Sequence, residues 1–146
     1  MCGITGCIEP FAREEVLGRA IRAMIAPLHH RGPDDEGVWL DPGAGVALGH
    51  KRLSVLDLSP AGHQPMISAG GRYIVVFNGE IYNHLALREQ LDPLLQETVG
   101  TERRSGWRGH SDTETLLAGF EVWGVEETVR RSVGMFALAV WDKASR

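Results

Sequence analysis

The sequence predicts an α+β fold of short strands and a few helices that pack as a single domain. Strands are indicated by several runs rich in β-branched and aromatic residues, of which "RYIVVFN" at 72–78 is the strongest. Helices are indicated by apolar residues at helical spacing over 13–28 and by start and stop signals at the two ends of 111–124. With 146 residues, 43% of them hydrophobic, the chain is long enough to form one core.

In the first part of the chain, a strand precedes an amphipathic helix. Residues 3–9, "GITGCIE", are rich in β-branched side chains and broken by glycine, which predicts a strand. Residues 13–28 predict a helix because one face collects Val16, Leu17, Ala20, Ile21, Met24, Ile25 and Leu28. The polar segment 29–37, "HHRGPDDEG", contains Gly32-Pro33 and predicts a turn.

The middle of the chain predicts strands joined by short connections. "GVWL" at 37–40 and "GVALGH" at 45–50 predict a strand pair around an Asp-Pro-Gly turn. "RLSVLDL" at 52–58 alternates with period two, as a strand does, and a loop follows it. The strand at 72–78 runs directly into "GEIYNH", and then into a short helix that ends by Asp92-Pro93.

The last third predicts two further helices and a strand. Residues 93–110 are charged and irregular, which predicts a loop or lid. Ser111 and Glu114 have the spacing of a capping box, so a helix should begin there and stop at Gly124. "VEETVRR" predicts a shorter second helix, and "MFALAVWD" at 135–142 predicts a buried strand.

The final strand leads to an expectation about the end of the domain. A strand this apolar needs partners at both edges and cover on both faces. Only "KASR" follows it. We therefore expect the domain to be C-terminally incomplete, with the second arm of a hairpin missing.

Charge and composition argue against several classes of function. A net charge of −4 and a pI near 5.8 give no basic footprint for nucleic acid. No run approaches the ~20 apolar residues of a membrane helix, and the N-terminus lacks the pattern of a signal peptide. Cys2 and Cys7 lie about 16 Å apart in an extended segment, beyond disulfide reach. We therefore expect a reduced, cytoplasmic thiol protein.

Cys2, in the opening "MCGITG", is the first candidate functional residue. A free cysteine is ordinarily a small buried hydrophobe with no chemical role. Removal of Met1 would, however, give Cys2 both a thiol and a free α-amine, so that one residue carries a nucleophile and its base. Gly3 would let other backbone approach the site closely.

Asn78-Gly79, in "FNGE", is the second candidate. Asn-Gly is the commonest hairpin signal, but the residues that follow predict a helix and not a returning strand. The Asn78 side-chain amide and the Gly79 N–H could instead form an oxyanion hole.

Three charged residues could together bind a zwitterionic amino acid. Arg52 could hold a carboxylate through its guanidinium fork, while Asp112 and Glu80 could bind an ammonium group. Each also has a plain structural explanation. Arg52 could be a solvated charge at a strand edge, and the two acids could favour helix starts.

Metal and nucleotide sites are not expected in this domain. The six histidines show no ligand spacing with one another or with the cysteines. Neither a Walker A loop nor a dinucleotide fingerprint occurs, so we expect no metal and no cofactor here.

Six motifs in order give the chain a resemblance to a known family: "MCGITG", "RGPDDEG", "GHKRLSVLDLS", "AGHQPM", "FNGEIYNH" and "GHSDTETLL". Together they resemble the N-terminal glutaminase domain of class II glutamine amidotransferases, in the asparagine synthetase branch. The resemblance implies an N-terminal-nucleophile hydrolase fold, which is an αββα sandwich of two antiparallel sheets between helix layers. It also makes 1–146 a glutamine amidotransferase type 2 domain whose synthetase domain is absent.

The resemblance further implies a role for each matching position. Cys2 matches the nucleophile, and Asn78 and Gly79 match the oxyanion donors. Arg52 matches the ligand of the glutamine α-carboxylate. The α-amine ligands and the backbone lining of the glutamine pocket match Gly79, Glu80, Asp112, Leu53 and Val55.

The implied activity is hydrolysis of L-glutamine to glutamate and ammonia through a thioester at Cys2. The ammonia would pass to a C-terminal synthetase domain, which uses ATP and magnesium to activate aspartate for asparagine biosynthesis. Two alternatives stay open: another acceptor, such as a sugar carboxylate in polysaccharide biosynthesis, and a catalytically silent module that keeps the fold. A homodimer is a further possible assembly.

Overall fold

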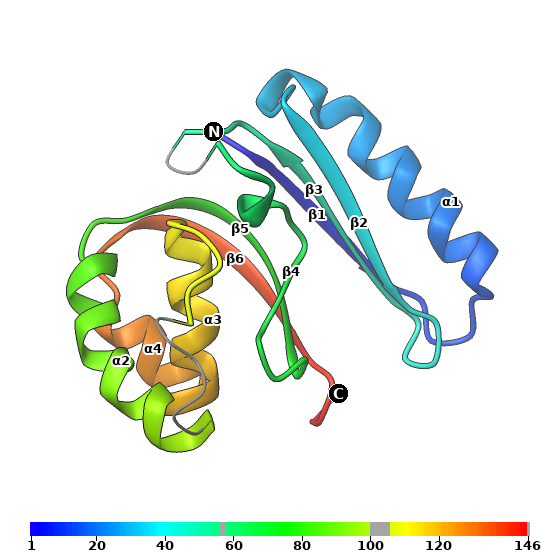
Figure 1. Ribbon diagram of the computed structural model, residues 1–146. Helices are drawn as coiled ribbons and strands as arrows, with labels where there is room; N and C mark the ends of the chain where they lie inside the picture. The colour runs from blue at the N-terminus through cyan, green and yellow to red at the C-terminus, as the bar shows by residue number, and fades with distance from the viewer. Residues whose placement is uncertain (56–57, 100–105, 146) are drawn as a thin grey trace.

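The computed structural model describes residues 1–55, 58–99 and 106–145. In this part of the chain, two antiparallel sheets of three strands each lie between layers of helices. Figure 1 shows α1 outside one sheet, and α2, α3 and α4 outside the other. The order helix, sheet, sheet, helices confirms the α+β sandwich that the resemblance implied.

The first sheet has the strand order β1 (Gly3–Ile8), β3 (Val46–Arg52) and β2 (Asp35–Asp41). Both outer strands run antiparallel to β3, so the beginning of β1 lies beside the end of β3, with Gly3 opposite Lys51. The predicted strand pair at 37–40 and 45–50 is confirmed, because β2 and β3 are this hairpin.

The helix predicted over 13–28 is observed as α1 (Glu14–Ile25), followed by a 3₁₀ helix, η1 (Ala26–Arg31). Pro27 near the start of η1 has no N–H to continue the α-helical ladder, which explains the change. The centre of the predicted apolar face is buried, because α1 packs Leu17 and Ile21 against β3, whereas Val16 and Met24 of that face are exposed.

The second sheet has the strand order β4 (Met66–Ile67), β5 (Tyr73–Ile81) and β6 (Gly134–Asp142). A short 3₁₀ helix, η2 (Pro60–Gly62), precedes β4. The outer face of this sheet is covered by α2 (His84–Val99), α3 (Asp112–Trp123) and α4 (Val125–Arg131). None of the helices in the described ranges is long and apolar enough to cross a membrane.

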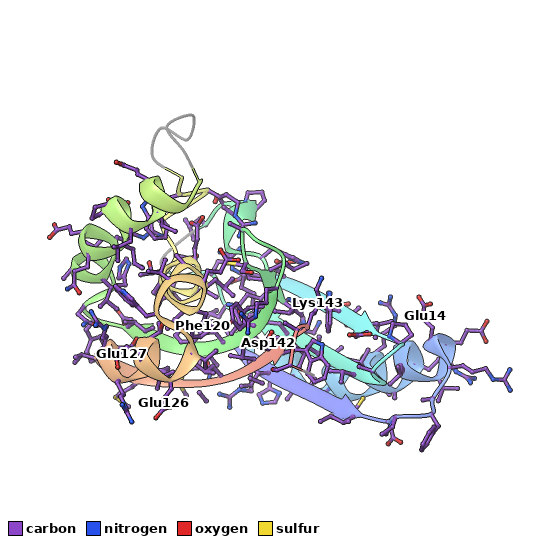
Figure 2. The ribbon with its side chains drawn as sticks, turned by 90° about the horizontal axis from the view of Figure 1, so that it is seen from below. Glu14, Phe120, Glu126, Glu127, Asp142 and Lys143 are labelled. Atoms are coloured by element: carbon purple, nitrogen blue, oxygen red, sulfur yellow. The ribbon has the colours of Figure 1, made fainter. Side chains whose placement is uncertain are left out.

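Side chains alternate between the two faces of each strand, and this alternation creates the layers. Between the sheets, Leu48 of β3 is buried against Ile74 and Val76 of β5. The other face of β5 sends Phe77 toward the helices, where Phe120 of α3 lies in the interior (Figure 2). Even-numbered residues of β3 and β5 therefore face the gap between the sheets.

The prediction that a helix ends at Asp92-Pro93 is wrong. Helix α2 continues to Val99 with Pro93 inside it, so the part of the predicted loop or lid from 93 to 99 is helical instead. Pro93 cannot donate to the carbonyl of Glu89, which lies on an exposed part of the helix where water can satisfy it. Residues 100–105 of the predicted loop lie outside the described residues.

The start and stop of α3 are confirmed, although the capping box is only half formed. The Ser111 hydroxyl accepts the N–H of Glu114 at 3.3 Å, and Gly124 ends the helix with φ 84°. The Glu114 carboxylate does not return to Ser111. It accepts the N–H groups of Arg108 and Gly109 at 2.7 and 3.0 Å, which closes the loop before the helix.

The strand suggested by the alternation at 52–58 is not formed in its described residues. Arg52 ends β3, and the next two N–H groups bond elsewhere. Leu53 N–H donates to the sulfur of Cys2, and Ser54 N–H donates to the Asp34 carboxylate at 2.8 Å. Contacts from distant residues thus override the local alternation.

Strand β6 is confirmed at 134–142, but it is not a fully buried strand. In the described part of the chain it lies at the edge of its sheet, and its side chains alternate between half-buried and exposed. Met135 is 75% exposed because the first sheet packs mainly against β5 and leaves this stretch of β6 uncovered.

Candidate active site

The predicted site residues meet in one cleft, where β1 begins and β3 ends. The cleft has a volume of about 300 Å³. Its walls come from the gap between the sheets, the loop after β3 and the beginning of α3. All predicted site residues line it, namely Cys2, Arg52, Leu53, Val55, Asn78, Gly79, Glu80 and Asp112.

Cys2 is half-buried and is held by the loop that follows β3. Its Sγ accepts the N–H of Leu53 at 3.4 Å and lies 3.7 Å from the Leu53 carbonyl, so the Leu53 peptide fixes the position of the sulfur. The Cys2 carbonyl accepts a hydrogen bond from Arg31 Nε at 3.0 Å. The antiparallel register of β1 and β3 makes these contacts possible, since it places the first residues beside the end of β3.

Arg52 is only 8% exposed and is on the face of β3 that looks into the gap between the sheets. Its Nη1 donates to the Ser59 carbonyl at 3.1 Å, so the guanidinium is oriented by the following loop. A Cβ at Gly62 would lie 2.6 Å from Arg52 Cζ, so only glycine leaves room for the guanidinium. The explanation as a solvated charge is therefore wrong.

Asn78 and Gly79 lie within β5 and do not form a turn, because the strand continues to Ile81. Among the described residues, the buried Asn78 Oδ1 has no hydrogen-bond partner, so no hydrogen bond of this oxygen stabilises the fold. Gly79 has φ 154°, and a Cβ there would lie 2.5 Å from Phe136 Cα of β6. This position therefore requires glycine.

The two acidic residues differ in environment. Asp112 is 4% exposed, and its Oδ2 accepts the N–H of Ile81 at 2.9 Å. Burial raises the pKa of Asp112, while the Ile81 N–H opposes this rise. Glu80 is exposed at the mouth of the cleft. A cationic ligand that contacted Asp112 would compensate the cost of burying this carboxylate.

Leu53 and Val55 follow β3 along one side of the cleft. The backbone of Leu53 contacts Cys2, which places this segment beside the sulfur. Val55 is 72% exposed at the mouth.

Several lining residues were not singled out from the sequence. They include Gln64, Tyr82, Thr113 and Met135. Gln64 and Thr113 lie inside motifs that carry the resemblance, "AGHQPM" and "GHSDTETLL", and that was the signal available for them. Met135 is far from any motif, and only the pairing of β5 with β6 brings it to the cleft.

His50, buried between the sheets near the cleft, makes stability depend on pH. Desolvation lowers its pKa to about 4, whereas the unfolded chain should titrate near 6.5. As the pH falls, His50 therefore binds a proton in the unfolded state before it does so in the folded state. The free energy of unfolding should fall by roughly 3 kcal/mol between pH 7 and pH 4. Chemical denaturation of wild type and His50→Gln across this range tests it, since the variant should show a smaller loss.

The described residues contain no group of three or more His, Cys, Asp or Glu side chains that could hold a metal ion. Both cysteines are free thiols, and Cys7 lies on the α1 face of the first sheet, where burial raises its pKa.

A sandwich of two antiparallel sheets between helix layers, with Cys2 in its cleft, is consistent with the fold of the N-terminal-nucleophile hydrolases. Within this class, the family described as "glutamine amidotransferase domain" matches residues 1–146. The chain belongs to this family of glutamine amidotransferase domains.

Relatives of known name are consistent with this family. "Asparagine synthetase [glutamine-hydrolyzing] 3" of Bacillus subtilis (strain 168) is 38% identical over 151 residues, which cover 98% of this chain and 22% of the relative. "Asparagine synthetase [glutamine-hydrolyzing] 1" of the same strain is 37% identical over 98% of this chain and 21% of the relative. "Amidase chry2" of Gibberella zeae is 32% identical, with coverages of 98% and 21%. The chain thus spans about a fifth of the length of these relatives.

Proposed function

We propose that this chain hydrolyses L-glutamine to glutamate and ammonia through a covalent thioester on Cys2. One observation carries the proposal: a single cleft brings together a thiol, a buried arginine, an Asn-Gly pair and a buried carboxylate. These groups match the chemical parts of glutamine. Arg52 would bind the α-carboxylate, and Asp112 with Glu80 would bind the α-ammonium, so that the side-chain amide points at Cys2.

The reaction would proceed in two acyl-transfer steps. The Cys2 sulfur attacks the side-chain carbonyl carbon while its proton passes to the α-amine of Cys2, and Asn78 Nδ2 and Gly79 N–H stabilise the oxyanion. When the tetrahedral intermediate collapses, the C–N bond breaks and the amine returns the proton to the leaving ammonia. Water then adds to the thioester, which releases glutamate and restores the thiol.

The α-amine of Cys2 can act as the base only if Met1 is removed. With Met1 attached, the nitrogen of Cys2 is a peptide amide and cannot accept a proton. Met1 is 77% exposed at the mouth of the cleft, where it would be accessible to an aminopeptidase. We expect the active protein to lack the mass of one methionine by intact mass spectrometry. Full activity of a protein that keeps Met1 would exclude this amine as the base.

The direct test of the proposed function uses the full chain with L-glutamine. Glutamate and ammonia should appear in equal amounts. D-glutamine should not be hydrolysed because, with its carboxylate on Arg52 and its ammonium on Asp112, its side-chain amide would not point at Cys2. Absence of glutamate release from protein with a free Cys2 amine would support the alternative of a catalytically silent module.

For the fate of the ammonia, we propose delivery to an ATP- and magnesium-dependent synthetase domain that amidates aspartate. This rests on the names of the relatives and on the fifth of their length that the chain spans. Another acceptor, such as a sugar carboxylate, is the alternative. ATP-dependent, glutamine-dependent formation of asparagine by the protein with its synthetase domain would distinguish the two.

The fit between Gly62 and Arg52 gives a prediction about substrate binding. Gly62→Ala should displace the Arg52 guanidinium and raise the KM for glutamine by about tenfold or more, because the ion pair between Arg52 and the α-carboxylate of glutamine is weakened. Gly43→Ala, in the β2–β3 turn where a Cβ meets only an ordinary contact, is the matched control. Steady-state kinetics of both variants provide the test, and an unchanged KM in Gly62→Ala would contradict the role of Arg52.

A further inference from the structure

Strand β5, which carries Asn78, has no paired strand on one of its edges beyond Val75 in the described part of the chain. On the edge away from β6, β5 pairs with β4 only through Ile74 and Val75. Odd-numbered residues of β5 direct their backbone groups toward this edge. For example, the Tyr73 carbonyl accepts the N–H of Ser68, and the Tyr73 N–H donates to the Ser68 hydroxyl. In the described part of the chain no strand covers Phe77 on this edge, so its N–H and C=O need other partners.

Two buried side chains supply those partners. His50 of β3 is fully buried and lies with Nε2 3.0 Å from the Phe77 carbonyl, so this nitrogen carries the hydrogen. Burial lowers the pKa of His50, which keeps the ring neutral. Gln64, 6% exposed, accepts the Phe77 N–H with Oε1 at 2.6 Å.

The same two side chains connect the other parts of the cleft. His50 lies two residues before Arg52 on the same face of β3. Gln64 Nε2 reaches Thr113 Oγ1 at 3.4 Å, and Thr113 follows Asp112 in α3. One short chain of contacts therefore links the segments that hold Arg52, Asn78 and Asp112.

We propose that His50 and Gln64 are positioning residues of the glutaminase site, which hold the Phe77 peptide so that Asn78 and Gly79 point at the developing oxyanion. The proposal rests on the proposed function. It differs from the simpler view that both residues only satisfy the free edge of a strand. Positioning predicts a loss of transition-state stabilisation that depends on Asn78, whereas a purely structural role predicts a loss of stability alone.

The test is a double-mutant cycle with rescue, measured in the full chain as kcat and KM for glutamine. His50→Met, which removes the donor, should lower kcat roughly 10- to 100-fold with KM nearly unchanged, because a misplaced catalytic group costs about this much. His50→Gln, which can place an N–H near the position of Nε2, should restore most of kcat. In the Asn78→Ala background, His50→Met should lower kcat by a clearly smaller factor than in wild type, since only the part of its effect that acts through Gly79 remains.

Matched variants keep the result interpretable. His29→Met, at an exposed histidine outside the cleft, should leave kcat unchanged. If His50→Met does not fold, Gln64→Glu, which keeps the acceptor for Phe77 N–H, is compared with Gln64→Met, which loses it. Equal kcat losses in both Asn78 backgrounds, or an unchanged kcat in His50→Met and Gln64→Met, overturn the proposal. Absence of Cys2-dependent glutamate release from wild type would instead refute the proposed function, and this inference with it.

Discussion

Cys2→Ala is expected to reduce glutamate release by at least about a thousandfold, because the variant has no nucleophile to form the thioester. Glutamine binding should persist, since Arg52 and Asp112 are unchanged. The measurement is glutaminase activity together with glutamine affinity from calorimetry. The fold should survive, because a half-buried thiol is replaced by a smaller apolar side chain.

Cys7→Ala is the matched control for this experiment. Cys7 is also a half-buried free thiol of β1, but it packs toward α1 with Ala47 and Leu17 and not toward the cleft. Its replacement should leave kcat and KM unchanged. Equal activity of Cys2→Ala and wild type would end the thioester mechanism.

Asn78→Ala is expected to lower kcat about 100- to 1,000-fold, which is the usual cost of losing one oxyanion donor. Its effect on unfolding should be small, because the side-chain Oδ1 of Asn78 has no hydrogen-bond partner among the described residues. Steady-state kinetics and thermal unfolding of the same preparation test both halves of this prediction.

Asn83→Ala is a control for a purely structural asparagine. Its side chain donates to the Arg131 carbonyl and accepts the Val133 N–H, both at 2.9 Å, so it ties the start of α2 to the end of α4. This variant should lose stability and keep most of kcat. If Asn78→Ala instead lost stability with kcat unchanged, Asn78 would be a structural residue and not an oxyanion donor.

Local signals in the sequence predict both ends of α3 correctly and fail where a long-range contact prevails. Ser111 and Gly124 act through neighbouring backbone groups, so their positions are readable from the sequence. Pro93 predicts a helix stop, but α2 packs against α3 and continues past it. The alternation after Arg52 looked like a strand, but Leu53 N–H bonds to Cys2, which is 51 residues away.

The sequence by itself determined which chemical groups are available: the cysteine behind Met1, the Asn78-Gly79 pair, and the charges of Arg52 and Asp112. Only the tertiary structure decided that they share a cleft and that His50 and Gln64 hold the peptide before Asn78. The physical reason is the range of the interactions. Capping and periodicity act within a few residues, whereas the partner of a buried polar group is chosen by strand register and sheet packing across the whole domain.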